Sequence, residues 1–173
     1  MTAPQSRINE FRGAVVNTIK AALPNLRECS AQFGRFDLDQ LETTSVQSPA
    51  VRVGILKSKI TATASAQHEA LLSCAAFAVT DGKDRDNTAW AIAEAVSCLL
   101  ATNQMFGLTK LGTPTEISIQ PVISAGIRSR GAAIIAVEWQ QQLRQIGENI
   151  FDDTRVVRSE LYVSSEPEGE CDA

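Results

Sequence analysis

The only histidine of the chain, His68, is the first place to look for acid–base chemistry. Glu69 follows it directly. Neighbouring side chains of a strand point to opposite faces of a sheet, so this pair is poorly arranged to share a proton. We therefore interpret His68 as an ordinary surface or strand-end histidine. A single histidine also removes most hydrolase and metal schemes that depend on imidazole groups.

The acidic segment Asp81–Asp86, with the sequence DGKDRD, contains the residue types of a calcium site. It fails the EF-hand template, because no alignment gives a glycine at the sixth position and a glutamate at the twelfth. A solvated turn that caps the following helix explains it better. Asp152 and Asp153, with Glu148 nearby, form a second acidic group, but such a pair in an acidic segment is usually solvated. We expect no metal ligands here.

Four basic residues are the candidate contact sites of the chain. Arg128 and Arg130 fall in a predicted hairpin turn over residues 126–131. Alternating arginines on a tight loop can bind a carboxylate of a partner subunit or a phosphate, and a plain soluble hairpin tip is an equal alternative. Lys57 and Lys59, in a segment rich in Ser and Thr, have the same two interpretations. We predict that all four are assembly contacts.

No catalytic or cofactor motif accompanies these residues. The glycines form neither a P-loop nor a dinucleotide-binding fingerprint, and no nucleophile–base pair can be assembled. The four cysteines lack a CxxC spacing, and Cys74 and Cys98 fall in apolar patterns that favour reduced core thiols. We therefore expect no cofactor, no metal and no enzymatic activity.

Composition favours one domain with a substantial core, since 44% of the 173 residues are hydrophobic. The net charge of −4 is unevenly distributed: residues 147–173 contain eight acidic and two basic residues, which leaves the preceding part at +2. A net charge this small gives no reason to expect that this part binds a nucleic-acid phosphate backbone. The N-terminus lacks the apolar core of a signal peptide, and no apolar run is long enough to cross a bilayer, so we expect a soluble cytosolic protein.

Two helices are predicted from apolar residues at helical spacing. The stronger pattern covers Asp86–Asn103, and the side-chain oxygens of its first three residues suit an N-terminal cap. The other covers Arg7–Leu23 and ends before Pro24. Four strands are predicted from alternation, β propensity and turn residues. They cover Ala50–Leu56, Gln67–Thr80, a stretch that opens at Thr113 and has Pro121 at its edge or end, and Ala132–Leu143.

The predicted order is α-β-β-α-β-β, and the class is α+β. Short connections between paired strands favour a mainly antiparallel four-stranded sheet covered by the two helices. The polar segment Lys57–Ala66 either extends the hairpin as a projecting arm or forms a flexible loop, and the pattern of residues 25–48 is too weak to assign. We expect a single domain over residues 1–146. An acidic C-terminal extension, residues 147–173, should be partly disordered, with enough apolar content to add a strand or dock on a neighbour.

A series of features gives the chain a recognisable character: the N-terminal amphipathic helix, the SPAVRVGIL strand, the polar segment, the long second strand, the DNTAWAIAEAVSCLL helix, and the PTEISIQPVI and AAIIAVEWQQQLR strands. In this order of elements the chain resembles the tail terminator proteins of long-tailed bacteriophages, in particular the Mu-like prophage proteins of that group. The resemblance covers Arg7–Arg144, most of the chain.

This resemblance implies a structural role in the virion. Tail terminators form a homohexameric ring on the head-proximal end of the tail tube, stop its polymerisation and provide the surface for a head–tail connector or neck protein. DNA passes through the ring without sequence-specific binding, and assembly takes place in the host cytoplasm without a membrane. Sheet edges and the polar segment would then contact the tail tube protein and neighbouring subunits.

Two rival hypotheses remain. The first is another head–tail connector or neck protein, which would share the ring but bind on the head side. The second belongs to a different class: a regulatory α+β domain that binds a small molecule in a pocket between sheet and helices.

Overall fold

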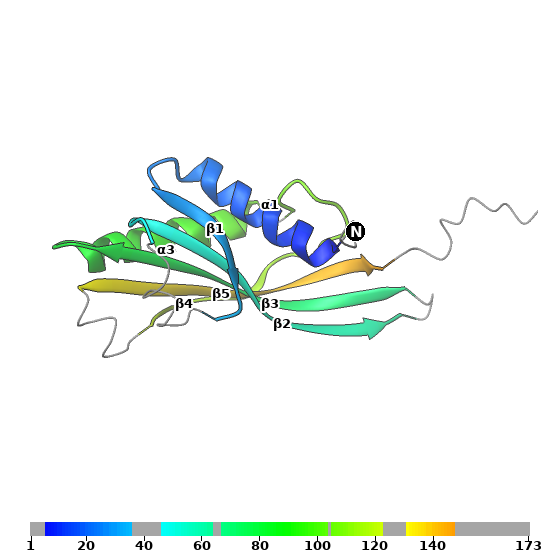
Figure 1. Cartoon of the computed structure of the whole chain (residues 1–173). Helices are drawn as coiled ribbons and strands as arrows, with labels where there is room; N and C mark the ends of the chain where they lie inside the picture. Colours follow the sequence, from blue (N-terminus) through cyan, green and yellow to red (C-terminus); the bar gives the residue numbers. More distant parts are fainter. Residues whose placement is uncertain (1–5, 36–45, 64–66, 104, 123–130, 148–173) are drawn as a thin grey trace, which may run out of the picture.

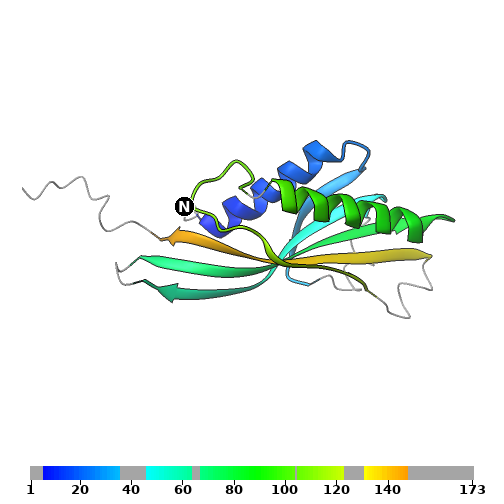
Figure 2. The same ribbon diagram turned by 180° about the vertical axis from the view of Figure 1, so that it is seen from behind.

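Two helices cover one face of a five-stranded sheet (Figures 1 and 2). The computed structural model describes residues 6–35, 46–63, 67–103, 105–122 and 131–147. The elements follow the chain in the order α1 (Arg7–Ala22), β1 (Glu28–Phe33), β2 (Ala50–Ala62), β3 (His68–Asp81), α3 (Arg85–Thr102), β4 (Thr115–Pro121) and β5 (Ala132–Ile146). The predicted α+β class is therefore confirmed.

The sheet differs from the prediction in strand number, strand order and direction. Its strands lie in the order β1-β2-β3-β5-β4; β1 is parallel to β2, and the other pairs are antiparallel. The predicted four-stranded sheet and the order α-β-β-α-β-β are wrong, because β1 falls in the stretch of residues 25–48 that sequence periodicity left unassigned. This strand is short and lies at an edge, where only Gln32 is buried, so it lacks the apolar alternation of an inner strand.

An ion pair and a backbone hydrogen bond attach β1 to β2. Arg52 Nη2 lies 2.7 Å from Glu28 Oε1, and both side chains are mostly buried. The backbone N–H of Arg27 donates to the carbonyl of Pro49, which aligns the two strands before their first paired residues. An ion pair between charged side chains thus helps to hold β1 against β2, and a hydrophobic sequence pattern does not indicate such a contact.

The main core lies between the sheet and the helices. α1 packs over β1 and β2, whereas α3 packs over β3 and β5. At the junction of the two helical regions the rings of Phe11 and Phe106 meet edge to face, with centroids 5.9 Å apart. The buried Trp139 donates from its ring nitrogen to Gln141, whose amide donates in turn to the carbonyl of Gly112. The polar atoms of these two buried side chains are therefore paired within the core.

A second, smaller core lies on the opposite face of the sheet. Neither described helix covers this face, and we call it the helix-free face. Its buried members come from three strands: Ala50, Ala75, Phe77, Val79, Ile134 and Ala136. The second half of β3 is consequently buried on both faces, and this explains the continuous apolar run that periodicity alone could not assign.

Helix boundaries agree closely with the predictions, whereas β2 and β5 extend beyond their predicted ends, to Ala62 and Ile146. The helices begin and end within one residue of the predicted bounds. β4 ends at Pro121 on the edge of the sheet, as its proline indicated. Lys57–Ala62 continue β2 and pair with β3, so this part of the polar segment is strand and not loop. We call residues 57–62 and 68–73 the distal hairpin; it projects beyond α1 in Figure 1.

Two adjacent leucines in β3 test which face carries the stability. Leu72 is fully buried under the helices, whereas Leu71 points to the helix-free face and is 41% exposed. Leu72→Ala should lower the free energy of unfolding by about 2–5 kcal/mol, because it removes buried apolar area and leaves a cavity. Leu71→Ala should cost about 0.5 kcal/mol. Chemical denaturation of the two variants measures both values, and equal losses would contradict the assignment of faces.

Candidate assembly surfaces

One side of β2 is open along the distal hairpin. β1 ends at Phe33, opposite Ile55, and a register shift follows between Ile55 and Lys57. Beyond this point the described part of the chain pairs β2 with β3 alone. We call the unpaired side of Leu56–Ala62 the open edge of β2. Unpaired strand edges present N–H and C=O groups to any extended segment that can reach them.

Lys57 and Lys59 lie on this hairpin with exposed side chains. Lys59 is opposite Leu71, so both lysines point to the helix-free face, away from α1. On the other face of the same strand Ile60 is 53% exposed. The structure therefore brings the two predicted lysines together on one face and adds an exposed apolar residue that the sequence analysis did not single out.

A groove of about 600 Å³ lies on the helix-free face of the distal hairpin. It is open to solvent, and its lining comes from β2, β3, β5 and the segment before β4: Lys59, Thr61, Glu69, Leu71, Gly112, Thr113, Thr115, Gln142 and Arg144. Glu69 accepts a hydrogen bond from the side-chain amide of Gln142 and lies 3.7 Å from Arg144 Nε. The charges at its centre are thus already paired, which leaves Lys59 as the cation at its rim.

The opposite edge of the sheet is formed by β4. Nearly all its residues are exposed, including Ile117 at 36%. Residues just before β4 extend the same edge along β5. The backbone N–H of Gly112 donates to the carbonyl of Gln142, and the backbone N–H of Arg144 donates to the carbonyl of Lys110. One side of β4 pairs with β5, and the described residues place no strand on its other side.

The outer face of α3 is apolar for a surface helix. After the first turn its only charged residue is Glu94, and Trp90 is 47% exposed. Its inner face is buried through Ala89, Ala93, Val96 and Leu100, as expected for a helix that covers the sheet. A helix that is apolar on all sides usually has a partner on each. The presence of only one charged residue after Asp86, Glu94, was the sequence signal for this second surface.

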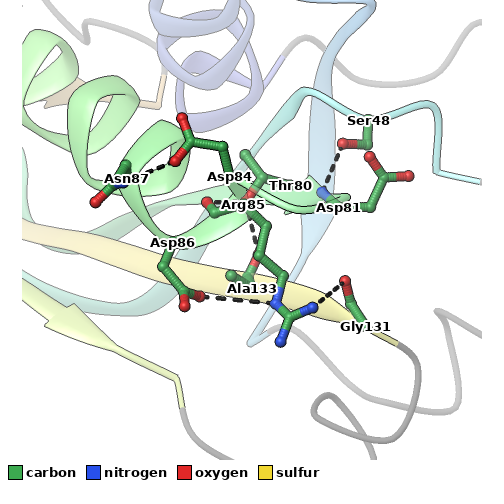
Figure 3. A network of polar contacts seen from close by, with 9 residues as sticks. All are labelled: Ser48, Thr80, Asp81, Asp84, Arg85, Asp86, Asn87, Gly131 and Ala133. Carbon is green, nitrogen blue, oxygen red and sulfur yellow. Dashed lines mark hydrogen bonds and ion pairs between the residues drawn. The ribbon is translucent and has the colours of Figure 1, made fainter.

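A polar network fixes the start of α3 between two strands (Figure 3). The Thr80 hydroxyl donates to the carbonyl of Arg85 over 2.7 Å, and Arg85 Nη1 donates to the carbonyl of Gly131 over 3.2 Å. The end of β3, the first turn of α3 and the residue before β5 are therefore held together. Ser48 joins the network by accepting the backbone N–H of Asp81.

The acidic segment before α3 serves this helix start. Asp84 occupies the N-cap position, but its carboxylate accepts from the side-chain amide of Asn87 and makes no bond to a backbone N–H. The predicted side-chain cap at the helix start is therefore wrong, because the helix begins one residue earlier, at Arg85. Asp86 lies 3.7 Å from Arg85 Nε. Within the described ranges, no three Asp, Glu, His or Cys side chains are grouped so that they could hold a metal ion.

His68 is the exposed first residue of β3, as expected for a strand-end histidine. Glu69 interacts with Gln142 and Arg144, so its partners lie on the adjacent strand. Arg128, Arg130 and the acidic group of Glu148, Asp152 and Asp153 lie outside the described residues.

The described cysteines differ in exposure. Cys74 is buried, as predicted, and burial raises the pKa of its thiol. Cys98 is exposed, so the prediction of a core thiol is wrong there; it lies on the outer face of α3, which is itself apolar. Cys29 donates from its thiol to the carbonyl of Val16, and burial raises its pKa to about 11, against the opposing effect of Lys20.

No protein-family model matches the chain, and no curated protein matches it in sequence. No helix among the described elements is long and apolar enough to cross a membrane.

Thiol alkylation tests these environments. At pH 8 iodoacetamide should label Cys98 well before Cys29, because a pKa near 11 in place of 9.0 lowers the thiolate fraction of Cys29 by about a hundredfold. Because the pKa of Cys29 is raised in the folded protein, its neutral thiol adds to the free energy of unfolding. This contribution is fully present below pH 9 and is lost as the pH rises towards 11.

Peptide mass spectrometry at increasing labelling times measures the rates. Labelling in urea is the control, since unfolding should remove the difference. Equal rates for Cys29 and Cys98 in the native protein would contradict the described burial.

Proposed function

We propose that this chain is a structural protein of a bacteriophage tail. In this proposal it caps the head-proximal end of the tail tube as a ring, ends tube polymerisation and provides the surface for head–tail joining. The resemblance over Arg7–Arg144 suggests the role. The observation that carries it is the pair of different exposed surfaces on opposite sides of one sheet.

A closed ring requires each subunit to present two different, complementary surfaces, because its contacts are heterologous. This chain offers the open edge of β2 on one side of the sheet. On the other side it offers the edge of β4, with the apolar outer face of α3 nearby. A self-complementary dimer would need only one such patch. The two-sided arrangement therefore favours a ring over an isologous dimer.

The distal hairpin suits contact with the tail tube. It projects beyond the helices and carries Lys57 and Lys59 on one face. The charge of the part before residue 147 is only +2, and Glu69 lies in the groove beside Lys59. Such a surface lets DNA pass through a ring without strong phosphate binding.

The rival hypotheses differ in partner and in pocket. A head–tail connector or neck protein would use the same surfaces but bind on the head side. A regulatory domain requires a ligand pocket between sheet and helices, a region that buried side chains such as Phe11, Leu72 and Trp139 occupy. The groove on the helix-free face is the alternative ligand site for that hypothesis.

Light scattering and negative-stain imaging of the purified chain, with and without the tail tube protein, test the proposal. We expect rings alone or on tube ends, because some subunits assemble only on their template. A compact monomer or dimer that never decorates tube ends would overturn it. Rings that bind only the head connector would favour the neck-protein hypothesis.

Charge reversal tests the distal hairpin. Lys57→Glu/Lys59→Glu should weaken decoration of tube ends by about tenfold, since charge pairs at an interface can each contribute about 1 kcal/mol or more. The matched control is Lys20→Glu/Lys83→Glu, which changes the same charge at two exposed positions outside the hairpin. Counting capped tubes in micrographs measures the effect. Equal loss in both variants would show a general charge effect and contradict a hairpin contact.

Arg128 and Arg130 are the second test. Reversing both charges should impair tail assembly or head joining, because a loop carboxylate or phosphate partner would then be repelled. The measurement is the yield of joined particles in a complementation assay. Normal assembly by the double variant would remove these arginines from the interface.

A further inference from the structure

The open edge of β2 combines hydrogen-bonding, charged and apolar features. Lys57 and Lys59 flank it on the helix-free face. On the helix-covered face, Ile60 is 53% exposed, and Phe33 at the end of β1 is 89% exposed. An occupant of this edge therefore needs strand-forming residues with an apolar side and an acidic group on the other side.

The C-terminal extension contains a segment of this kind. Residues 154–163 read TRVVRSELYV, and from Val157 onwards their two faces differ. One face has Val157, Ser159, Leu161 and Val163, whereas the other has Arg158, Glu160 and Tyr162. This alternation is typical of a half-buried strand. The segment belongs to the part of the chain that follows β5.

The exit point of the chain places this segment within reach. Ile146 at the end of β5 pairs with His68, which pairs with Ala62 at the tip of the distal hairpin. A new strand beside β2 would lie three strand spacings away, about 14 Å. Residues 147–156 are able to span about 30 Å when extended. Gly147 has φ +86°, a conformation that suits a change of chain direction at this point.

We propose that residues 157–163 pair with the open edge of β2 in the same chain and form a sixth, antiparallel strand. The direction follows from the topology: β5 runs towards the hairpin tip in parallel with β2, so a segment that returns from the tip runs antiparallel to β2. The same-chain occupant is favoured because the segment leaves the sheet at the level where the open edge ends.

The charges fix the register. With Glu160 opposite Lys59, Arg158 lies opposite Thr61, whose neighbour on β3 is Glu69. Glu160 then lies directly opposite a positive charge on the same face. The apolar face of the segment turns to the helix-covered side. There Leu161 lies diagonal to Ile60, and Val163 lies near the end of β1.

Disulfide trapping in the full chain tests the pairing. In a Cys98→Ser/Cys171→Ser background, Ser58→Cys is combined in turn with Ser159→Cys, Leu161→Cys and Val163→Cys, which share its face in the proposed strand. Mild oxidation should give an intramolecular disulfide, highest for Leu161→Cys. The matched control combines Leu161→Cys with Ser118→Cys, an exposed position on β4 at the opposite sheet edge. Peptide mass spectrometry and non-reducing electrophoresis identify the products.

The outcomes separate the possible occupants. A disulfide within one chain, at least tenfold above the control, supports the proposal. A disulfide that joins two chains overturns it in favour of a second copy, and a yield equal to the control overturns the pairing itself. The disulfide yield is measured on purified protein without tail components. Its outcome therefore tests the strand pairing independently of the proposed tail function.

Hydrogen exchange provides a second measurement. Val157→Pro should speed exchange of amides in residues 56–62 by about tenfold, because proline removes a donor and disfavours the added strand. Gly169→Pro is the control beyond the segment. Amides of β3 between β2 and β5 report whether the fold is intact. Unchanged exchange at residues 56–62 would overturn the proposal.

Discussion

The structure depends on the position of β3 in the sheet. This strand pairs with β2 on one side and β5 on the other along nearly its whole length, and α3 packs over it. Its second half is buried on both faces, whereas its first half is buried only beneath the helices. The change occurs near Leu72, where Leu71 and Glu69 begin to face solvent on the helix-free side.

That change divides one sheet into two regions that differ in burial. In the region that is buried on both faces, packing in the two cores favours apolar side chains. Few polar side chains there are exposed for contact with a partner. In the distal hairpin only one face is fixed by packing. The other face carries the groove, and β2 lacks the neighbour that β1 provides further back. The groove and the open edge of β2 therefore lie where the second core ends.

The sequence predicted the elements whose energy comes from their own pattern. Both helices, four strands and the edge position of β4 follow from periodicity, turn residues and Pro121. β1 was missed because its position depends on the Arg52–Glu28 ion pair and on pairing with a strand distant in sequence. The open edge of β2 was missed for the same reason, since it exists only because β1 stops at Phe33.

Lysines at a sheet edge have two interpretations, and their surroundings decide between them. Lys57 and Lys59 alone are typical of strands that avoid aggregation, because a second positively charged edge would be repelled. A purely protective edge, however, gains nothing from exposed apolar residues, and Ile60 and Phe33 lie on the same border. The combination excludes non-specific partners by charge and favours one that brings both an acidic and an apolar face. An edge of this kind is selective and not merely protected.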